Sequence, residues 1–168
     1  MKLSVITICY NDRNGLLKTL ESVKSQSSHD FQYIVIDGAS KDGSADLLTE
    51  YASVIDYSVS ESDKGIYNAM NKGIREAKGE YCLFMNAGDT FYANDTVEKA
   101  LPLLDGTDFL SGDTYCVFPD GKSTVWKAVN NVTTYLMAIY SLSHQATFIR
   151  TELLKQRPYR EDLKVADR

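Results

Sequence analysis

Three aspartates, Asp37, Asp63 and Asp89, stand at the ends of short apolar runs or in the polar turns that follow them. The strand ends of a parallel sheet meet at one edge, and open α/β sheets bind ligands there. A carboxylate at such an edge can accept a hydrogen bond or bind a hard cation. Lys64 and Lys72 are close to these residues in the chain and could meet a phosphate. We therefore predict that these side chains share one crevice.

Each of these residues also has a structural explanation. Any single aspartate could cap a helix, and Asn86-Ala87-Gly88-Asp89 contains only residue types that are common in turns. Lys72 fits a solvated helix face equally well. Three carboxylates at matching topological positions are harder to explain as caps, so the site interpretation is favoured.

The elements that must position these residues alternate between strand and helix patterns. Predicted strands lie at 3–10, 31–36, 55–59 and 81–85, and predicted helices at 16–23, 47–51, 66–77 and 95–104. Pro102 lies inside the last helix and is expected to end it early. This order is typical of an α/β fold with a mostly parallel sheet flanked by helices.

The pattern changes after Gly106. Segments 109–118 and 122–129 flank Pro119-Asp120-Gly121, which predicts a hairpin. A helix is expected at 132–142, a strand at 145–149 and a short helix at 151–155. We predict one domain over 1–168, with a parallel nucleotide-binding half (1–105) and a mixed, partly antiparallel half (106–168).

Composition and missing motifs narrow the function. The 168 residues are 43% hydrophobic with a net charge of -5, which gives no electrostatic reason to expect nucleic acid as a partner. Cys9, Cys82 and Cys116 have no metal-ligand spacing and are predicted to be reduced thiols in a cytoplasmic protein, without a signal peptide or membrane span. Neither phosphate-binding glycine loop nor a G-x-S-x-G elbow is present.

The two histidines differ in setting. His29 stands in a polar loop and is predicted to be exposed. His144 opens an apolar run in Ser143-His144-Gln145-Ala146-Thr147-Phe148, so it either starts a strand or belongs to the site, and we favour the site.

Five segments together resemble the family 2 inverting glycosyltransferases, which have the GT-A fold. These segments are residues 4–11, 35–44, 63–73, 79–89 and 144–148. Each is weak alone, but five in the same order along the chain form a specific signature. The resemblance covers essentially the whole chain, and it implies a Rossmann-like sheet that binds a nucleotide-sugar, with the second half facing the acceptor.

The resemblance also implies roles for the residues. The nucleotide-binding residues are then predicted to be Thr7, Tyr10, Asp37, Asp63, Lys64 and Lys72. Tyr10 would stack on the base, and Asp37 would accept its imide N–H in a hydrogen bond worth about 1.5–3 kcal/mol. Asp63 would lie near the ribose and Lys64 near the phosphates.

Asp89 matches the final acid of the family's DXD motif, which implies a ligand to Mg²⁺ or Mn²⁺ at the donor diphosphate. Asn86 and Gly88 stand where many members of the family carry Asp, so the charge of this site is lower. One carboxylate is chemically sufficient, because phosphate and water oxygens can complete the coordination.

The family's general base corresponds to a late acid in this chain. Asp167 is our choice, with Asp162 in reserve, although Asp167 could instead cap a helix. Asp113 and His144 are predicted to hold the acceptor. Members of the family continue with further helices, so we expect a chain truncated after Arg168 with low activity in isolation.

The resemblance therefore implies an enzyme that transfers a sugar from a nucleotide-sugar donor, expected to be a UDP-sugar, to a bacterial surface glycan or lipid-linked glycan. The expected location is the cytoplasm, at most peripherally at the inner face of the membrane. One alternative is a nucleotide-binding module of the same fold without catalysis. The other is a sugar-1-phosphate nucleotidyltransferase, for which Tyr10-Asn11-Asp12-Arg13-Asn14-Gly15 is a poor match.

Overall fold

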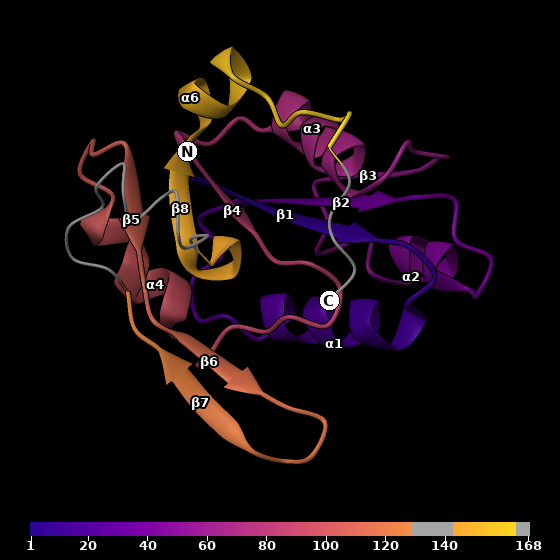
Figure 1. The fold of residues 1–168 in the computed structure, drawn as a ribbon, viewed down its shortest axis with the longest axis horizontal. Coiled ribbons are helices and arrows are strands. Elements are labelled where there is room, and N and C mark those ends of the chain that lie inside the picture. Colours follow the sequence, from indigo (N-terminus) through magenta and orange to yellow (C-terminus); the bar gives the residue numbers. More distant parts are fainter. Residues whose placement is uncertain (129–142, 164–168) are drawn as a thin grey trace.

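A six-stranded sheet with the order β3-β2-β1-β4-β8-β5 forms the centre of the fold (Figure 1). The computed structural model describes residues 1–128 and 143–163, so the helix predicted at 132–142 lies outside the described residues. The strands of this sheet are β1 (Leu3–Cys9), β2 (Gln32–Asp37), β3 (Tyr57–Ser60), β4 (Tyr81–Phe84), β5 (Phe109–Ser111) and β8 (Thr147–Arg150). Strands β1 to β4 are parallel, β8 is antiparallel to β4, and β5 is antiparallel to β8. The predicted mostly parallel α/β architecture is confirmed.

Helices cover both faces of the sheet (Figure 1). They are α1 (Arg13–Lys24), α2 (Ser44–Glu50), α3 (Ile66–Glu76), α4 (Thr96–Ala100) and α6 (Thr151–Gln156), with 3-10 turns η1 (Leu101–Leu103) and η2 (His144–Ala146). One core cluster packs α1, α2 and α4 against the sheet, and the other packs α3 and α6 against the opposite face. The α-helical part of the segment containing Pro102 ends at Ala100, as the proline predicts.

Strand β1 is central because each of its residues is buried. Val5 packs in the cluster that contains Leu16 and Leu20 of α1, whereas Ile6 packs with Met70 of α3. Alternate side chains of a strand point to opposite faces, so a strand covered on both faces is apolar throughout. The uninterrupted apolar character of this run therefore follows from its place between two helical layers.

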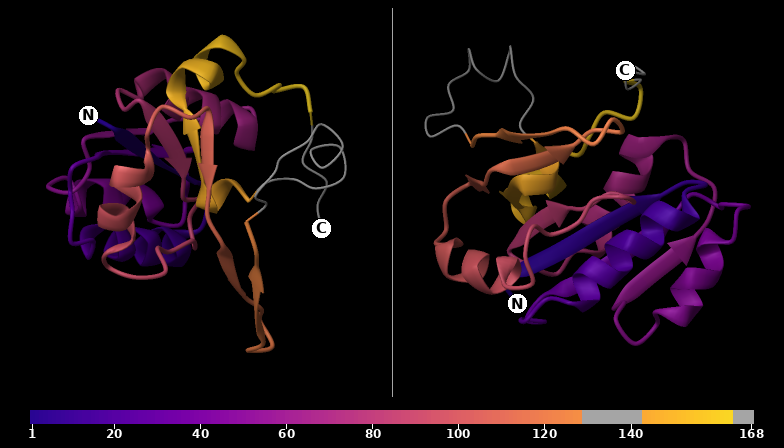
Figure 2. Two further views of the ribbon diagram at one scale, coloured as in Figure 1. Left: turned by 90° about the vertical axis from the view of Figure 1, so that its left-hand side faces the viewer. Right: turned by 90° about the horizontal axis from the view of Figure 1, so that it is seen from below.

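The segment 109–118, predicted as one side of the hairpin, contains two strands, and only the second of them belongs to the hairpin. It divides at Gly112-Asp113 into β5 and β6 (Thr114–Val117), because β8 pairs with β5 while β7 (Ser123–Trp126) pairs with β6. The backbone N–H of Gly112 donates to the carbonyl of Ala146 at 2.7 Å and fixes the division. The β6–β7 hairpin turns at the predicted place and projects from the body of the molecule (Figure 2).

Two strand boundaries also differ from expectation. The segment 145–149 begins as η2, because the carbonyl of Ser143 accepts hydrogen bonds from the Ala146 N–H and the Thr147 hydroxyl; the strand starts only at Thr147. Strand β3 starts later than predicted because the N–H of Ile55 still bonds to Tyr51 in the turn after α2.

The described residues contain no helix that is long and apolar enough to span a membrane. The three cysteines are free; Cys9 and Cys82 are buried, and Cys116 is partly exposed.

Candidate functional site

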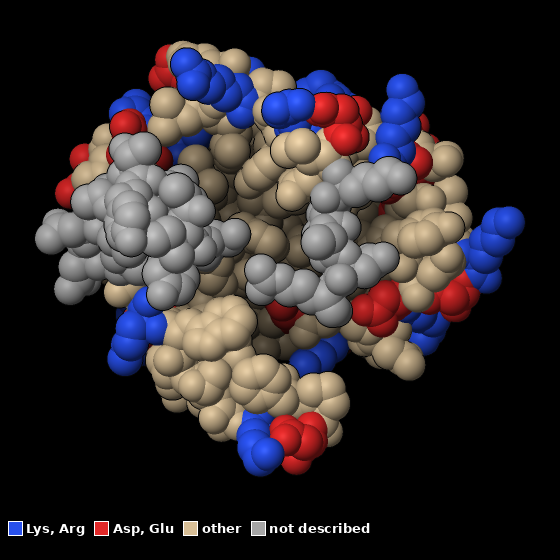
Figure 3. All heavy atoms as spheres, in the orientation of Figure 1, with Lys and Arg blue, Asp and Glu red and all other residues tan. Residues whose placement is uncertain are grey.

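The switch point of the sheet lies between β1 and β4. From β1 the chain proceeds to β2 and β3 on one side, then returns to place β4 on the other side. Such a reversal opens a crevice at the carboxyl ends of the two strands. Hydrogen bonds from Met85 N to Ile6 O (2.9 Å) and from Ala87 N to Ile8 O (3.1 Å) extend the pairing of β1 and β4 to the residues that follow β4. In the orientation of Figure 1, the surface is hollowed near its centre, over the central strands (Figure 3).

The 86–89 turn is closed by its own residues. The backbone N–H of Asn86 donates to Oδ2 of Asp89 at 3.1 Å, and the N–H of Asp89 donates to the carbonyl of Asn86 at 2.9 Å. Gly88 has φ +97°, a left-handed conformation that favours glycine. Burial raises the pKa of Asp89, while hydrogen bonds from Asn86 and Gln145 oppose this shift. Water has been partly removed from this carboxylate, which strengthens its interaction with a cation.

His144 contacts this turn from the second half of the chain. Its Nε2 lies 3.3 Å from Nδ2 of Asn86. Burial lowers the pKa of His144, which favours the neutral imidazole. The amide oxygen of Asn86 is buried and has no hydrogen-bond partner among the described residues. An unpaired buried oxygen is costly and indicates a position where a ligand can supply the missing contact.

Tyr10 and Asp63 meet at Gly38. A Cβ built on Gly38 would lie 2.7 Å from Oδ2 of Asp63 and 3.1 Å from Cδ2 of Tyr10, so only glycine allows these side chains to approach. The Tyr10 ring is 68% exposed and available for stacking on a base. Asp63 also accepts a hydrogen bond from the N–H of Gly65 at 2.9 Å. The structure therefore brings these two predicted nucleotide residues together.

Asp37 is fully buried beside them and bonded within the protein. Its carboxylate accepts hydrogen bonds from the hydroxyls of Ser40 and Ser60, both at 2.5 Å, and from the N–H of Ser40 at 3.0 Å. Asp37 thus holds the loop that contains Gly38. Its predicted contact with a base stays a prediction.

The two lysines have different surroundings. Nζ of Lys72 lies 3.0 Å from both the Ser62 carbonyl and a Glu61 carboxylate oxygen, and its side chain is only 12% exposed. This contact ties α3 to the loop after β3. Lys64 is exposed in that loop. Phosphate binding by either lysine stays a prediction.

Three further predicted residues are not part of this cluster. Thr7 is fully buried, and its hydroxyl lies 3.0 Å from the Tyr33 hydroxyl. Asp113 accepts hydrogen bonds from Nζ of Lys127 (2.7 Å) and the N–H of Ala128 (2.9 Å), which fastens the base of the β6–β7 hairpin. Asp167 lies outside the described residues.

The turn can hold a divalent cation only with help from a ligand. Within 1–128 and 143–163 no group of three or more His, Cys, Asp or Glu could hold a metal ion. The turn offers the carboxylate of Asp89 and the amide oxygen of Asn86, which has no partner within the part of the chain that the structure describes. Oxygen donors suit Mg²⁺ or Mn²⁺, and both ions accept few protein ligands when phosphate oxygens are available. The donor set therefore fits a metal that is shared with a bound diphosphate.

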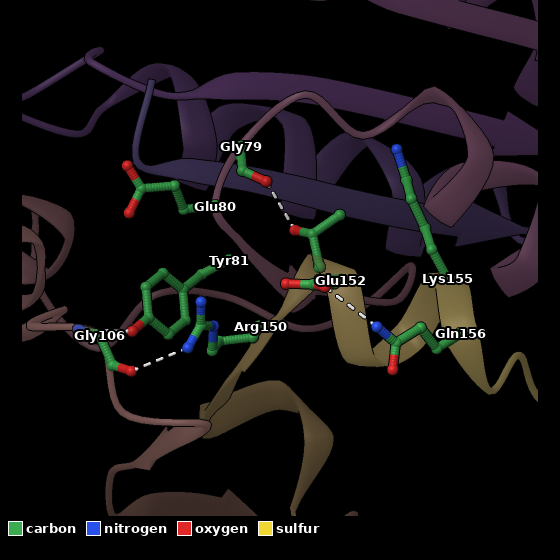
Figure 4. A pocket seen from close by; sticks show the side chains of 9 residues that line it. Gly79, Glu80, Tyr81, Gly106, Arg150, Glu152, Lys155 and Gln156 are labelled. Atoms are coloured by element: carbon green, nitrogen blue, oxygen red, sulfur yellow. Dashed lines mark hydrogen bonds between the residues drawn. The ribbon is translucent and has the colours of Figure 1, made fainter.

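A cavity of about 530 Å³ lies elsewhere, at the amino-terminal end of β4 (Figure 4). Its lining side chains bond to neighbours: Nη1 of Arg150 donates to Gly106 O at 3.1 Å, and Nε2 of Gln156 donates to Glu152 at 3.0 Å. This cavity shares no residue with the crevice at the carboxyl ends of the strands. We assign the functional site to the crevice, where the partly buried Asp89 carboxylate lies beside an Asn86 amide oxygen that has no partner among the described residues.

Sequence reasoning missed several residues that support the site. Ser40 and Ser60 bind Asp37, Thr19 bonds to the 86–89 turn, and Asn71 holds the segment at 159–161. Thr19 and Asn71 each interrupt the apolar stripe of a helix, and both are buried. A polar residue on a buried helix face needs a partner, and this was the signal in the sequence.

The chain is similar to known glycosyltransferases. The family model described as "Glycosyl transferase family 2" matches residues 4–158. Rv1514c, an uncharacterized glycosyltransferase of Mycobacterium tuberculosis, is 40% identical over 105 residues, which are 62% of this chain and 40% of that protein. TuaG of Bacillus subtilis, whose name refers to teichuronic acid biosynthesis, is 33% identical over 105 residues, 61% of this chain and 41% of that protein.

The solved structures agree with this assignment. The chain superposes on S. aureus TarS 1-349 with a TM-score of 0.80 and 26% identity. For the complex of TarS 1-349 with UDP the TM-score is 0.76 and the identity is 25%. Both superpositions cover 99% of this chain and 52% of TarS 1-349. The chain thus spans about half the length of the relatives it matches. The match over residues 4–158, together with the GT-A architecture, shows that the chain belongs to glycosyl transferase family 2.

Proposed function

We propose that this chain binds a UDP-sugar and carries the active site of an inverting glycosyltransferase that extends a bacterial surface glycan. The observation that carries this proposal is the 86–89 turn at the switch point of the sheet. It presents a partly buried Asp89 and an Asn86 oxygen that no described residue contacts by a hydrogen bond. TarS, which shares the fold and 25% of its sequence with the chain, binds UDP in its solved complex. The resemblance to TuaG supports a surface glycan as the product.

The nucleotide would lie across Gly38. The exposed ring of Tyr10 can stack on the base, at about 1–3 kcal/mol per stacked base. Asp63 can accept a hydrogen bond from a ribose hydroxyl, and its position is fixed by the N–H of Gly65. Both side chains are brought close by the missing Cβ at position 38.

Asp89 would hold Mg²⁺ or Mn²⁺ at the diphosphate, with Asn86 contributing its amide oxygen. When bound, the metal supplies positive charge against the negative charge of the departing UDP. The protein contributes a partly dehydrated carboxylate whose orientation the turn fixes. Because less water surrounds this carboxylate, its attraction to a cation is stronger than at the open surface.

The transfer is a single displacement. An acceptor hydroxyl loses its proton to a carboxylate, its oxygen forms a bond to C1 of the sugar, and the bond between C1 and the diphosphate oxygen breaks with inversion. A positioned base contributes about 10²–10⁴-fold to such a step. We propose Asp167 as this base.

The neighbouring acids support this choice. Asp162 is paired with Arg160 through two contacts (3.1 and 2.6 Å), and this hydrogen bonding lowers the pKa of Asp162, which makes it a weaker base. Glu161 accepts hydrogen bonds from Asn68 and Asn71, both at 2.9 Å. Because Asn68 lies in the first turn of α3, the segment that precedes Asp167 runs beside the carboxyl edge of the sheet.

The acceptor would lie on the side of β8 and η2, with His144 at the boundary between donor and acceptor and Asp113 at the base of the β6–β7 hairpin. Free cysteines support a reducing compartment, so we propose a cytoplasmic protein that meets a lipid-linked acceptor at the inner face of the membrane.

Calorimetric titration with UDP tests the donor site. We expect Mn²⁺ to strengthen UDP binding by the unmodified chain, and Asp89→Asn to bind UDP equally with and without Mn²⁺. Asp30→Asn, in an exposed loop, is the matched control and should keep the metal response. If Mn²⁺ has no effect on the unmodified chain, the role of Asp89 is wrong.

The base is tested in the longer protein. Asp167→Asn should abolish sugar transfer and leave UDP affinity unchanged, whereas Asp162→Asn should keep most of the activity. Transfer that persists in Asp167→Asn would assign the base to another residue, and UDP binding without any transfer by the unmodified protein would indicate a module without catalysis.

A further inference from the structure

A single hydroxyl of α1 contacts three backbone groups of the 86–89 turn. Oγ1 of Thr19 lies 2.8 Å from the carbonyl oxygen of Asp89, 3.2 Å from that of Asn86 and 3.0 Å from the N–H of Gly88. It also lies 3.2 Å from the carbonyl of Gly15 in its own helix. Thr19 is fully buried, and it is far from this turn in the chain.

The chemistry of a hydroxyl explains how this contact orients the turn. A hydroxyl has one proton to donate and two lone pairs. The Gly88 N–H can donate to Oγ1, while the Thr19 proton goes to the nearest carbonyl, that of Asp89. The contact therefore fixes the peptide groups on both sides of the Gly88–Asp89 bond, including the left-handed conformation of Gly88.

The position of Asp89 depends on these peptide groups. Its side chain accepts one backbone hydrogen bond within the turn, from Asn86, and a side-chain hydrogen bond from Gln145. The carboxylate can keep both contacts only while the backbone conformation at 88–89 is held. Removing the hydroxyl would leave the Gly88 N–H and the Asp89 carbonyl without this partner. The turn could then relax, because the Gly88 backbone has a wide range of alternative conformations.

We propose that Thr19 is a positioning residue for the reaction: it holds the Asp89 carboxylate in the direction that binds the metal and donor diphosphate. This inference rests on the proposed function. Thr19 touches neither substrate nor metal, and it acts through the 86–89 turn. It makes helix α1, which has no predicted site residue of its own, part of the binding machinery.

Three variants test this role. Thr19→Val keeps the shape of the side chain and removes the hydroxyl, while Thr19→Ser keeps the hydroxyl. Thr151→Val is the matched control, because Thr151 is also buried and donates to a backbone carbonyl, that of Gly79 at 2.6 Å, at the other edge of the sheet. Each variant is titrated with UDP over a range of Mn²⁺ concentrations, and amide hydrogen exchange is measured without ligand.

In Thr19→Val we expect the Mn²⁺ concentration for half-maximal enhancement of UDP binding to rise about tenfold, with metal-free UDP affinity unchanged within about twofold. The Gly88 amide should exchange about tenfold faster. Thr19→Ser should restore both values. Thr151→Val should lower thermal stability but keep the metal response and the exchange of Gly88.

The results that would contradict the role of Thr19 differ from those that would contradict the role of Asp89. If the unmodified chain responds to Mn²⁺ and Thr19→Val responds equally, or if Gly88 exchange is unchanged, Thr19 has no positioning role. If the unmodified chain shows no response to Mn²⁺, the proposed function of Asp89 fails first and removes the inference with it.

Discussion

The amide nitrogen of Asn86 lies 3.3 Å from Nε2 of His144, and this contact joins the 86–89 turn of the first half of the chain to η2 of the second half. The amide N–H can only donate, so Nε2 must accept, which requires a neutral imidazole with its proton on Nδ1. A protonated ring would place two donors opposite each other. The contact therefore depends on pH, and so does the junction between the donor and acceptor sides.

Stability should consequently fall as the pH is lowered through the titration of His144. Burial lowers the pKa of His144 below its ordinary value of 6.5, so the unfolded chain takes up a proton more readily than the folded chain. Below pH 6.5 the free energy of unfolding should decrease, by at most about 1.4 kcal/mol per pH unit for one group, until the folded pKa is reached. Denaturant unfolding at pH values from about 5 to about 8, the range in which histidine titrates, measures this change in the free energy of unfolding.

His144→Gln should remove this part of the pH dependence. His29→Gln is the matched control, since His29 is exposed in a loop, and it should leave the dependence in place. An identical pH profile for the His144 variant and the unmodified chain would contradict the expectation.

Asn86→Asp should lower the stability of the metal-free protein and raise its affinity for Mn²⁺. The substitution replaces a buried amide with a carboxylate and removes the donor to His144. We expect the free energy of unfolding of the metal-free protein to fall by about 1–3 kcal/mol, because a buried charge loses its hydration. Mn²⁺ should restore much of this loss, since the turn then carries two carboxylates. Thermal unfolding with and without Mn²⁺ measures both effects.

Asn94→Asp serves as the control, because Asn94 is exposed and its side chain bonds to Ser25, outside the 86–89 turn. It should change the melting temperature little under either condition. An Asn86→Asp variant that Mn²⁺ stabilises no more than the unmodified chain would show that Asn86 does not face the metal.

Regular periodicity made much of the fold predictable. The helix containing Leu16 and Leu20 and the strand containing Ile34 were predicted nearly at their observed bounds, because local pattern and tertiary burial agree there. The division at Gly112 was not predictable from local pattern, since the strand-forming character of 109–118 is nearly continuous. The segment divides because β8, which comes later in the chain, pairs only with residues 109–111 of it.

The site was predictable to a similar extent. Strand ends indicated the edge at which Asp37, Asp63 and Asp89 lie, because topology fixes that edge. The residues that orient these acids could not be identified from the sequence. Thr19 reaches the 86–89 turn, and Ser60 reaches Asp37, only through the packing of elements distant in sequence.

Gly79→Ala should destabilise the fold without touching the site. An added Cβ would lie 2.4 Å from the carbonyl carbon of Leu3 and 2.5 Å from the N of Ser4, and backbone atoms of a central strand cannot move away cheaply. We expect a loss of about 3 kcal/mol in the free energy of unfolding. Gly112→Ala is the matched control, because its nearest neighbour is Ala146 O at 3.7 Å, and it should change stability by less than about 0.5 kcal/mol. Equal melting temperatures for the two variants would be inconsistent with the close approach at Gly79.

Asn71 should control activity from the buried face of α3. Its side chain donates to the carbonyl of Tyr159 at 2.9 Å and accepts from the N–H of Tyr159 at 3.0 Å, while Tyr159 packs between Tyr67 and Phe84. These contacts fix the segment that leads to the proposed base. In Asn71→Ala we expect this segment to lose its orientation, because both backbone groups of Tyr159 lose their partner.

In the longer protein, Asn71→Ala should therefore lower kcat by about tenfold or more, since misplacement of a catalytic group is costly, while UDP affinity in the presence of Mn²⁺ stays the same. Amide exchange at 159–163 should rise in parallel. Asn94→Ala, which removes a surface amide, should alter neither value. A variant with loosened 159–163 and unchanged kcat would separate this segment from catalysis and move the general base away from the acids that follow it.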